Sequence, residues 1–325
     1  MRTSNWIRYK SIAVAFLFLI IVTLSGCAAS GSGYGGMDPY AKPTTFQGKT
    51  IMQSNDTAHA DETSPSTPLP DMTGRDFEAS GDRYFGQQEY AMAFVQYGKA
   101  LEMSPNTSRL LYKQGLLFLV TGQNKAAADY FHKVIENVPD SASANEGLGT
   151  AFYKLHDYEK AEPAFRKAVE LSPRMWRSRN YLGNIYDFKK DYDRAAQEYA
   201  EAILIRPNDV KLYNNLGVSL HLSGRYQESI NAYKKALSAE GDKAKVYNNL
   251  GLVLAKTGRY DAAFDVFKEG SNTSEAYNNL GCVYMAEGDF QKAEQMFNKA
   301  IETSPSFYHK AHENLKKLGV AKIVD

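Results

Sequence analysis

Cysteine is scarce in this chain, which has only Cys27 and Cys282 among its 325 residues. Two cysteines cannot build a framework of disulfides, and they cannot form a structural metal site from thiolates alone. Charge of one sign is also lacking, because 38 basic and 37 acidic residues leave a formal net charge of +1. A nearly neutral chain offers no overall electrostatic reason to bind nucleic acid or an acidic substrate.

Motifs of catalysis and of cofactor binding are missing as well. The sequence has no glycine-rich phosphate loop, no nucleophile elbow and no paired-ligand motif. His309 and His312 are three residues apart, but no third ligand accompanies them, so a surface pair is the simpler interpretation. We therefore expect a non-catalytic protein without a cofactor or a metal. The alternative, an enzyme with a concealed site, would need a cluster of acid–base residues, and none is evident.

Long hydrophobic runs are limited to one segment near the N-terminus. Arg2, Arg8 and Lys10 precede residues 12–24, in which only Thr23 is polar. As a helix this run would span about 20 Å, which is shorter than the hydrocarbon core of about 30 Å. A basic start followed by a short apolar run indicates an export signal rather than a membrane span.

The end of this run resembles the lipobox of bacterial lipoproteins, because residues 24–27 read Leu-Ser-Gly-Cys. The resemblance implies that residues 1–26 are a lipoprotein signal peptide and that Cys27 becomes the lipid-bearing, palmitate-carrying first residue. Ala28 follows in place of aspartate, which implies sorting to the periplasmic face of the outer membrane. An uncleaved anchor, or an ordinary signal peptide with a chance cysteine, is the alternative.

Residues 27–73 have a composition unlike the rest of the chain. Glycine is concentrated in residues 31–36, five prolines lie between residues 39 and 70, and serine and threonine fill much of the remainder. Such a segment buries too little apolar surface to offset the entropy lost on ordering. We expect a lipidated N-terminus and a disordered tether that holds the folded part away from the bilayer. A docking peptide for a partner is the alternative.

A glycine recurs at a fixed interval through the remaining sequence. The interval is 34 residues five times and then 30 residues, at Gly81, Gly115, Gly149, Gly183, Gly217, Gly251 and Gly281. A period of this size indicates stacked copies of one small unit. With the glycine as position 8, the copies are residues 74–107, 108–141, 142–175, 176–209, 210–243, 244–273 and 274–307.

The pattern within each copy predicts two helices that pack against each other. Large apolar residues at positions 4, 7 and 11 share one face of a first helix with the glycine. A second helix carries small residues at position 20 and, in most copies, at position 27. Position 24 is always aromatic: Tyr97, Phe131, Phe165, Tyr199, Tyr233, Phe267 and Phe297. Glycine inside a helix costs stability, so we expect another helix to approach closely at position 8.

This pattern resembles the tetratricopeptide repeat family over residues 74–307. The resemblance implies an all-α fold, a right-handed superhelical solenoid of about seven helix pairs with a C-terminal capping helix. We expect the cap and a tail in residues 308–325, with the helix over residues 308–317. Gly270 and the loss of four residues predict that the second helix of the sixth copy ends about one turn early.

The first helices of such a solenoid line a concave groove. On a helical wheel, positions 2, 5, 6, 9, 12 and 13 lie opposite the packing stripe, so we expect them to face this groove. Seven asparagines occupy positions 5 and 6: Asn180, Asn214, Asn215, Asn248, Asn249, Asn278 and Asn279. This asparagine ladder resembles the peptide-binding ladder of other tetratricopeptide superhelices, since an amide offers both a donor and an acceptor. Bridging or capping of neighbouring repeats is the alternative.

Two further features of the groove bear on the partner. Paired asparagines occur only in the last three copies, so we expect the C-terminal half to carry specific binding. Arg177, Lys211 and Lys245 are basic residues at position 2, where the helix macrodipole disfavours a cation by roughly a few tenths of a kcal/mol. We therefore expect a protein or peptide partner with an acidic segment, and no nucleic acid. A solvated face is the alternative.

The layout of signal peptide, lipidated cysteine, tether and repeats resembles that of bacterial lipoproteins that assemble pili and their secretin pores, of the Tad/Flp or type IV type. The resemblance implies a scaffold that is lipid-anchored in the bacterial cell envelope. An adaptor that recruits peptidoglycan hydrolases or proteases is the alternative.

Overall fold

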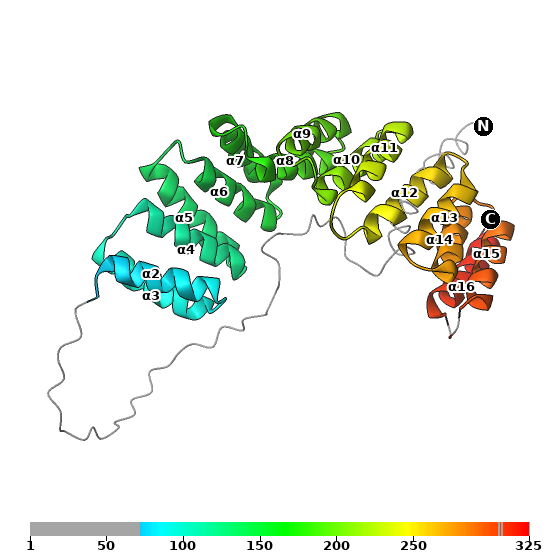
Figure 1. The fold of residues 1–325 in the computed structure, drawn as a ribbon, viewed down its shortest axis with the longest axis horizontal. Helices are drawn as coiled ribbons and strands as arrows, with labels where there is room; N and C mark the ends of the chain where they lie inside the picture. The colour runs from blue at the N-terminus through cyan, green and yellow to red at the C-terminus, as the bar shows by residue number, and fades with distance from the viewer. Residues whose placement is uncertain (1–71, 305, 307, 325) are drawn as a thin grey trace, which may run out of the picture. The chain divides into compact units, whose positions relative to one another are not determined.

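The computed structural model describes residues 72–304, 306 and 308–324. The described residues contain fifteen α-helices and no strand (Figure 1), which confirms the all-α class expected from the repeats. They divide into two compact units between Ile185 and Tyr186, here called the N-terminal unit and the C-terminal unit. The predicted signal peptide, Cys27 and nearly all of the predicted tether lie outside the described residues.

The N-terminal unit consists of consecutive antiparallel helix pairs. α2 packs against α3, α4 against α5, and α6 against α7. The helices are α2 (Gly74–Gly86), α3 (Tyr90–Met103), α4 (Ser108–Val120), α5 (Asn124–Asn137), α6 (Ala142–Lys154), α7 (Tyr158–Leu171) and the greater part of α8 (Trp176–Phe188). The first helices α4 and α6 also contact each other, so consecutive pairs stack in register.

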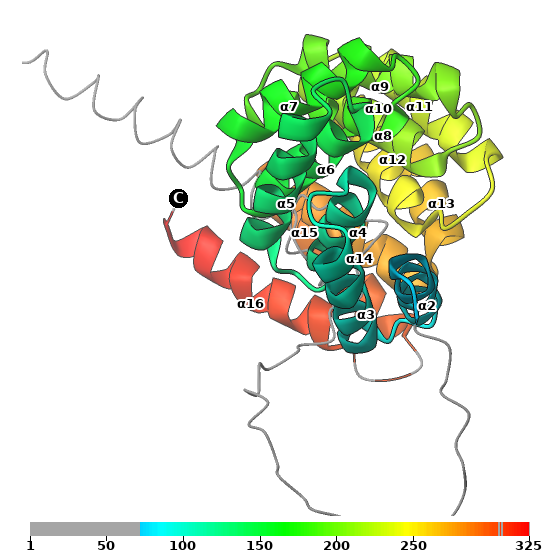
Figure 2. The same cartoon turned by 90° about the vertical axis from the view of Figure 1, so that its left-hand side faces the viewer.

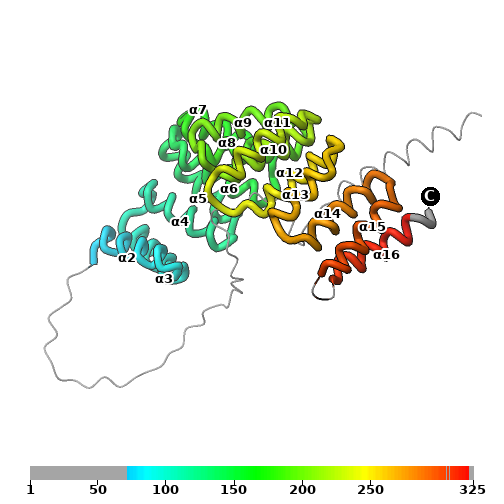
Figure 3. The backbone as a smooth tube through the Cα atoms, turned by 45° about the vertical axis from the view of Figure 1, so that its right-hand side comes forward, coloured from blue at the N-terminus to red at the C-terminus, as the bar shows by residue number. Residues whose placement is uncertain are grey.

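The C-terminal unit continues the same arrangement. Its helices after α8 are α9 (Tyr192–Ile205), α10 (Val210–Leu222), α11 (Tyr226–Ser238), α12 (Ala244–Lys256), α13 (Tyr260–Gly270), α14 (Thr273–Ala286), α15 (Phe290–Glu302) and α16 (His309–Val324). α10 pairs with α11, α12 with α13, and α14 with α15, and Figure 3 shows α14, α15 and α16 side by side.

Local sequence fixes where the helices begin. At the start of α2, the backbone N–H of Thr73 donates to the Asp76 carboxylate at 2.8 Å, and the Thr73 hydroxyl accepts from the Asp76 N–H. This capping box satisfies donors that the first turn leaves unpaired. Asp157, Asp191 and Asp289 cap α7, α9 and α15 through their side chains. Helix α2 therefore begins at Gly74, where we expected the first repeat to begin.

The recurring glycine lies against the aromatic ring of its own second helix. A Cβ atom built at Gly115 would lie 2.8 Å from the Phe131 ring, and one at Gly281 would lie 2.6 Å from the Phe297 ring. Both rings are fully buried. Interiors packed at crystal-like density have no room for an added methyl group at such a contact. The close approach of a second helix at position 8 is therefore confirmed.

The sixth pair is shorter than the others. α13 has 11 residues and ends at Gly270, whereas the other second helices have 13 or 14. Gly270 lies directly against Tyr247 of α12, so a larger side chain at its place would push the two helices apart. The expected early end of this helix is confirmed.

The C-terminal helix α16 is longer than expected. It runs to Val324 as one continuous helix (Figure 2), although we expected it over residues 308–317 with a tail beyond. Leu318, Ala321 and Lys322 favour a helix after Lys317, and one exposed glycine, Gly319, does not interrupt it. Ala311 and Leu318 are buried where α16 packs on α14 and α15. Among all described helices, none combines the length and apolar character needed to cross a membrane.

Candidate functional site

The asparagine ladder of the C-terminal unit joins consecutive first helices. The Asn249 amide of α12 donates from Nδ2 to Oδ1 of Asn214 on α10 at 3.0 Å. In the same way, Nδ2 of Asn279 on α14 donates to Oδ1 of Asn248 on α12 at 3.4 Å. In both pairs a position-6 amide donates to the position-5 amide of the preceding copy. The bridging role that the sequence left open is therefore present.

Bridging leaves half of each amide unused. The amino groups of Asn214 and Asn248 and the carbonyl oxygens of Asn249 and Asn279 make no hydrogen bond within the described part of the chain. All four side chains are half-buried, and none of these unused atoms is closed off from solvent without a partner. A face that presents alternating donors and acceptors can hydrogen-bond an extended peptide backbone. Bridging and peptide binding are thus compatible roles for the same residues.

Asn278 does not face an open groove, and that expectation is wrong. Its side chain is 1% exposed, and its Oδ1 accepts from Nδ2 of Asn314 at 2.9 Å. The reason is that α16 packs on α14 as a further first helix would, so position 5 of the last copy becomes an interhelix contact. Asn314 extends the ladder. Its position about one repeat after Asn278 was the feature of the sequence that could have predicted this contact.

Cys282 lies in the same interface as Asn278. Its side chain is buried against Ala293, Phe297 and Leu318. Cys282 therefore acts as a small apolar filler of this interface and not as a thiol in an open groove.

Asn180 and Asn215 lie half-buried on α8 and α10. They belong to different units, so their place in the ladder stays a prediction.

The basic residues at position 2 have unequal surroundings. Lys211 and Lys245 are exposed in the first turns of α10 and α12. Earlier in the series, Arg109 donates to both carboxylate oxygens of Glu78 at 2.7 and 2.6 Å, and Lys113 lies 2.7 Å from the same carboxylate. The Arg109 hydrogen bonds, with a further contribution from Lys113, lower the pKa of Glu78 to about 2. Arg109 therefore joins the first two repeats through Glu78 and does not offer a free positive charge.

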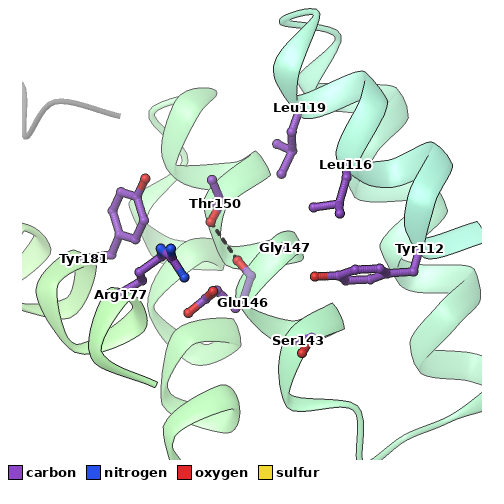
Figure 4. Close-up of a pocket in the computed structure, with 9 residues that line it drawn as sticks. All are labelled: Tyr112, Leu116, Leu119, Ser143, Glu146, Gly147, Thr150, Arg177 and Tyr181. Carbon is purple, nitrogen blue, oxygen red and sulfur yellow. Dashed lines mark hydrogen bonds between the residues drawn. The ribbon is translucent and has the colours of Figure 1, made fainter. Parts of the chain in front are cut away.

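Arg177 lines a pocket on the first helices of the N-terminal unit. The pocket lies between α4, α6 and α8 (Figure 4), and its lining comprises Tyr112, Leu116, Leu119, Ser143, Glu146, Gly147, Thr150, Arg177 and Tyr181. Its cavity volume is about 20 Å³, and a single water needs about 10–15 Å³ on that measure. The pocket therefore accepts the tip of one side chain rather than a whole small molecule.

Two small residues of the third repeat line the pocket, and one of them is tightly packed on its other side: a Cβ atom built at Gly147 would lie 2.5 Å from the Phe131 ring of α5. Ser143 and Gly147 occupy positions 2 and 6, where most other copies carry an arginine, lysine, tyrosine or asparagine. Tyr112 borders the pocket on one side and Tyr181 on the other. We did not predict this pocket, although two small residues in one copy of an otherwise bulky series were a signal for it.

A half-buried carboxylate lies where α8, α9 and α10 meet. Asp187 accepts hydrogen bonds from the Tyr199 hydroxyl at 2.8 Å and from the Ser219 hydroxyl at 2.7 Å. Burial nevertheless raises the pKa of Asp187 to about 6, because hydroxyl groups solvate a carboxylate less well than water does. Within residues 72–304 and 308–324, no group of three or more histidine, cysteine, aspartate or glutamate side chains is placed to hold a metal.

Asp187→Asn tests the cost of this partly desolvated charge. The folded-state pKa is above the unfolded value of 3.8, so the ionised carboxylate destabilises the fold above about pH 6 and not below about pH 4. We expect Asp187→Asn to raise the free energy of unfolding by about 1–2 kcal/mol at pH 7, with a smaller gain at pH 4.5. Urea unfolding at both pH values measures the change. The exposed control Asp193→Asn should shift stability by less than about 0.5 kcal/mol, and a destabilised Asp187→Asn at pH 7 would contradict the expectation.

Four models of the tetratricopeptide repeat match the chain, over residues 109–141, 146–210, 208–271 and 274–307. Together they span more than half of the sequence. No curated protein matches the chain.

Several solved structures are similar in fold. A tetratricopeptide repeat protein from Parabacteroides merdae is 17% identical, with a TM-score of 0.53, and the match covers 76% of this chain and 98% of that chain. The Cut9–Hcn1 structure of the APC/C is 19% identical with a TM-score of 0.51, covering 78% of this chain and 50% of that chain. A MamA protein is 27% identical with a TM-score of 0.48, covering 53% of this chain and 94% of that chain. The model matches over more than half of the sequence show that this chain belongs to the tetratricopeptide repeat family, whose repeats bind protein or peptide partners.

Proposed function

We propose that this protein is a non-catalytic scaffold that binds an extended segment of a partner protein on the face of its first helices. The observation that carries the proposal is the asparagine ladder of α10, α12 and α14, whose amides bridge the helices and keep unused donors and acceptors. Each bridge holds two side-chain amides in fixed orientation before a ligand arrives. Preorganisation of this kind lowers the entropic cost of binding.

The chemistry of the ladder suits main-chain recognition. The amino groups of Asn214 and Asn248 can donate to peptide carbonyl groups, and the oxygens of Asn249 and Asn279 can accept from peptide N–H groups. Such contacts give affinity without dictating side chains. Lys211 and Lys245, both exposed in first helical turns, favour an acidic segment beside the ladder, and this attraction should weaken with salt.

We infer a place in the cell envelope from the N-terminal sequence. The Leu-Ser-Gly-Cys sequence at residues 24–27 supports lipidation of Cys27, and two or more acyl chains suffice for stable membrane anchoring. With the tether and the repeats, this layout supports a role in assembling an envelope machine such as a pilus or a secretin, at the periplasmic face of the outer membrane.

Removal of the ladder amides tests the scaffold proposal. A variant with alanine at Asn214, Asn215, Asn248 and Asn249 should capture the partner from envelope extract at least tenfold less well, because each lost hydrogen bond contributes about 0.5–1.5 kcal/mol. The matched control replaces Gln227 and Asn231, exposed amides on the second helix α11. It should leave capture unchanged. If the ladder variant is folded by circular dichroism and captures the partner as the unaltered chain does, the ladder is purely structural.

Anchoring has an independent test in Cys27→Ser. We expect this variant to lose labelling by a fatty-acid analogue and to move from the membrane fraction to the soluble fraction, since serine has no thiol to acylate. Cys282→Ser is the control. Cys282 is buried between α14, α15 and α16, so its replacement should leave both fatty-acid labelling and membrane partitioning unchanged. Fatty-acid labelling of Cys27→Ser would contradict the proposed lipidation.

A further inference from the structure

The pocket between α4, α6 and α8 combines opposite charges with an apolar wall. Glu146 and Arg177 line one part of it, and Leu116 and Leu119 line another (Figure 4). The Ser178 hydroxyl donates to one Glu146 carboxylate oxygen at 2.8 Å, which fixes this carboxylate beside the pocket. The second carboxylate oxygen makes no hydrogen bond within the described residues.

Arg177 is held in place without a counter-ion. Its guanidinium carbon lies 4.8 Å from the centre of the Trp176 ring, a cation–π contact that orients the group. Its Nε is buried and has no acceptor among the described residues, and the guanidinium forms no ion pair there. A buried donor without an acceptor is costly, so a ligand oxygen at this place would be favoured.

The charges in the pocket decide which chemical group it can take. A carboxylate would be attracted by Arg177 and repelled by Glu146, and an ammonium group would meet the reverse. A purely apolar group would remove water from both charges without replacing its hydrogen bonds. A carboxamide has an oxygen for Arg177 and an amino group for Glu146, and it carries no net charge.

We propose that this pocket binds the side-chain carboxamide of a glutamine or asparagine in the partner peptide. The aliphatic stem of that residue packs on Leu116 and Leu119, and the amide tip fills the small cavity. The proposal rests on the proposed function, because the peptide must lie along the first helices. It adds a side-chain-specific anchor in the N-terminal unit to the main-chain ladder of the C-terminal unit.

Trp176 fluorescence reports on this pocket through the contact of the Trp176 ring with Arg177. The chain has two tryptophans, Trp6 and Trp176, so a full-length Trp6→Phe protein reports from Trp176 alone. Blocked Ala-Ala-X-Ala-Ala peptides, with glutamine, glutamate, lysine or leucine at X, are titrated while Trp176 emission is recorded. We expect the glutamine peptide to bind about tenfold more tightly than the other three. The reason is that its amide alone can form hydrogen bonds with both charged groups of the pocket.

Glu146→Gln should reverse the preference. This change leaves Arg177 as the sole charge in the pocket, so the glutamate peptide should now bind more tightly than the glutamine peptide by about tenfold. Arg177→Met should abolish discrimination in favour of glutamine. Glu170→Gln is the control, because Glu170 is an exposed glutamate of α7 outside the pocket, and its change should leave the ranking as it was.

Equal binding of all four peptides, no binding, or an unchanged ranking in Glu146→Gln would each overturn the carboxamide assignment. None of these outcomes would contradict the proposed function, which is tested separately by partner capture in the asparagine-ladder variant. Conversely, loss of the ladder without effect on capture would overturn the scaffold proposal even if the glutamine peptide is preferred.

Discussion

The contact between an aromatic ring and a glycine is the constraint on which the remaining structure depends. In each described glycine–ring contact of this kind, the ring of the second helix lies on the glycine of the first, so closely that even a methyl group would overlap it. This contact fixes the distance between the paired helices, and it fixes which side of the first helix points inward. Positions 2, 5 and 6 must then lie on the other side, where successive first helices meet.

On that second side, the same side chains both join the helices and present groups to a partner. Asn249 and Asn214 join two helices through one donor and one acceptor, and the unused half of each amide stays open to a partner. Near the start of the chain, Glu78 and Arg109 make the equivalent connection with charge, and at its end Asn278 and Asn314 make it in a buried interface. A repeat protein has only neighbour contacts to hold it together, so its binding face also has to be cohesive.

Most of the fold could be predicted from the sequence, because each packing pattern recurs in several copies of the repeat. The ring–glycine contact, the Gly74 start and the Gly270 end all follow from local residue patterns. The burial of Asn278 could not be predicted in this way, since it depends on α16, a helix outside the period. The pocket between α4, α6 and α8 was missed for a related reason: its lining comes from three different copies, so the pattern within a single copy does not show it.

A double-mutant cycle on Gly149 and Phe165 measures the central contact most directly. A Cβ at Gly149 would lie 2.7 Å from the Phe165 ring, so we expect Gly149→Ala to lower the free energy of urea unfolding by about 1–3 kcal/mol through overpacking. In a Phe165→Leu background the smaller side chain leaves room, and the same change should be neutral or stabilising by up to about 1 kcal/mol. Gly98→Ala, on a helix surface with nothing near the added methyl, is the control. An equal cost of Gly149→Ala in both backgrounds would show that the ring–glycine contact does not set the packing of the helix pair.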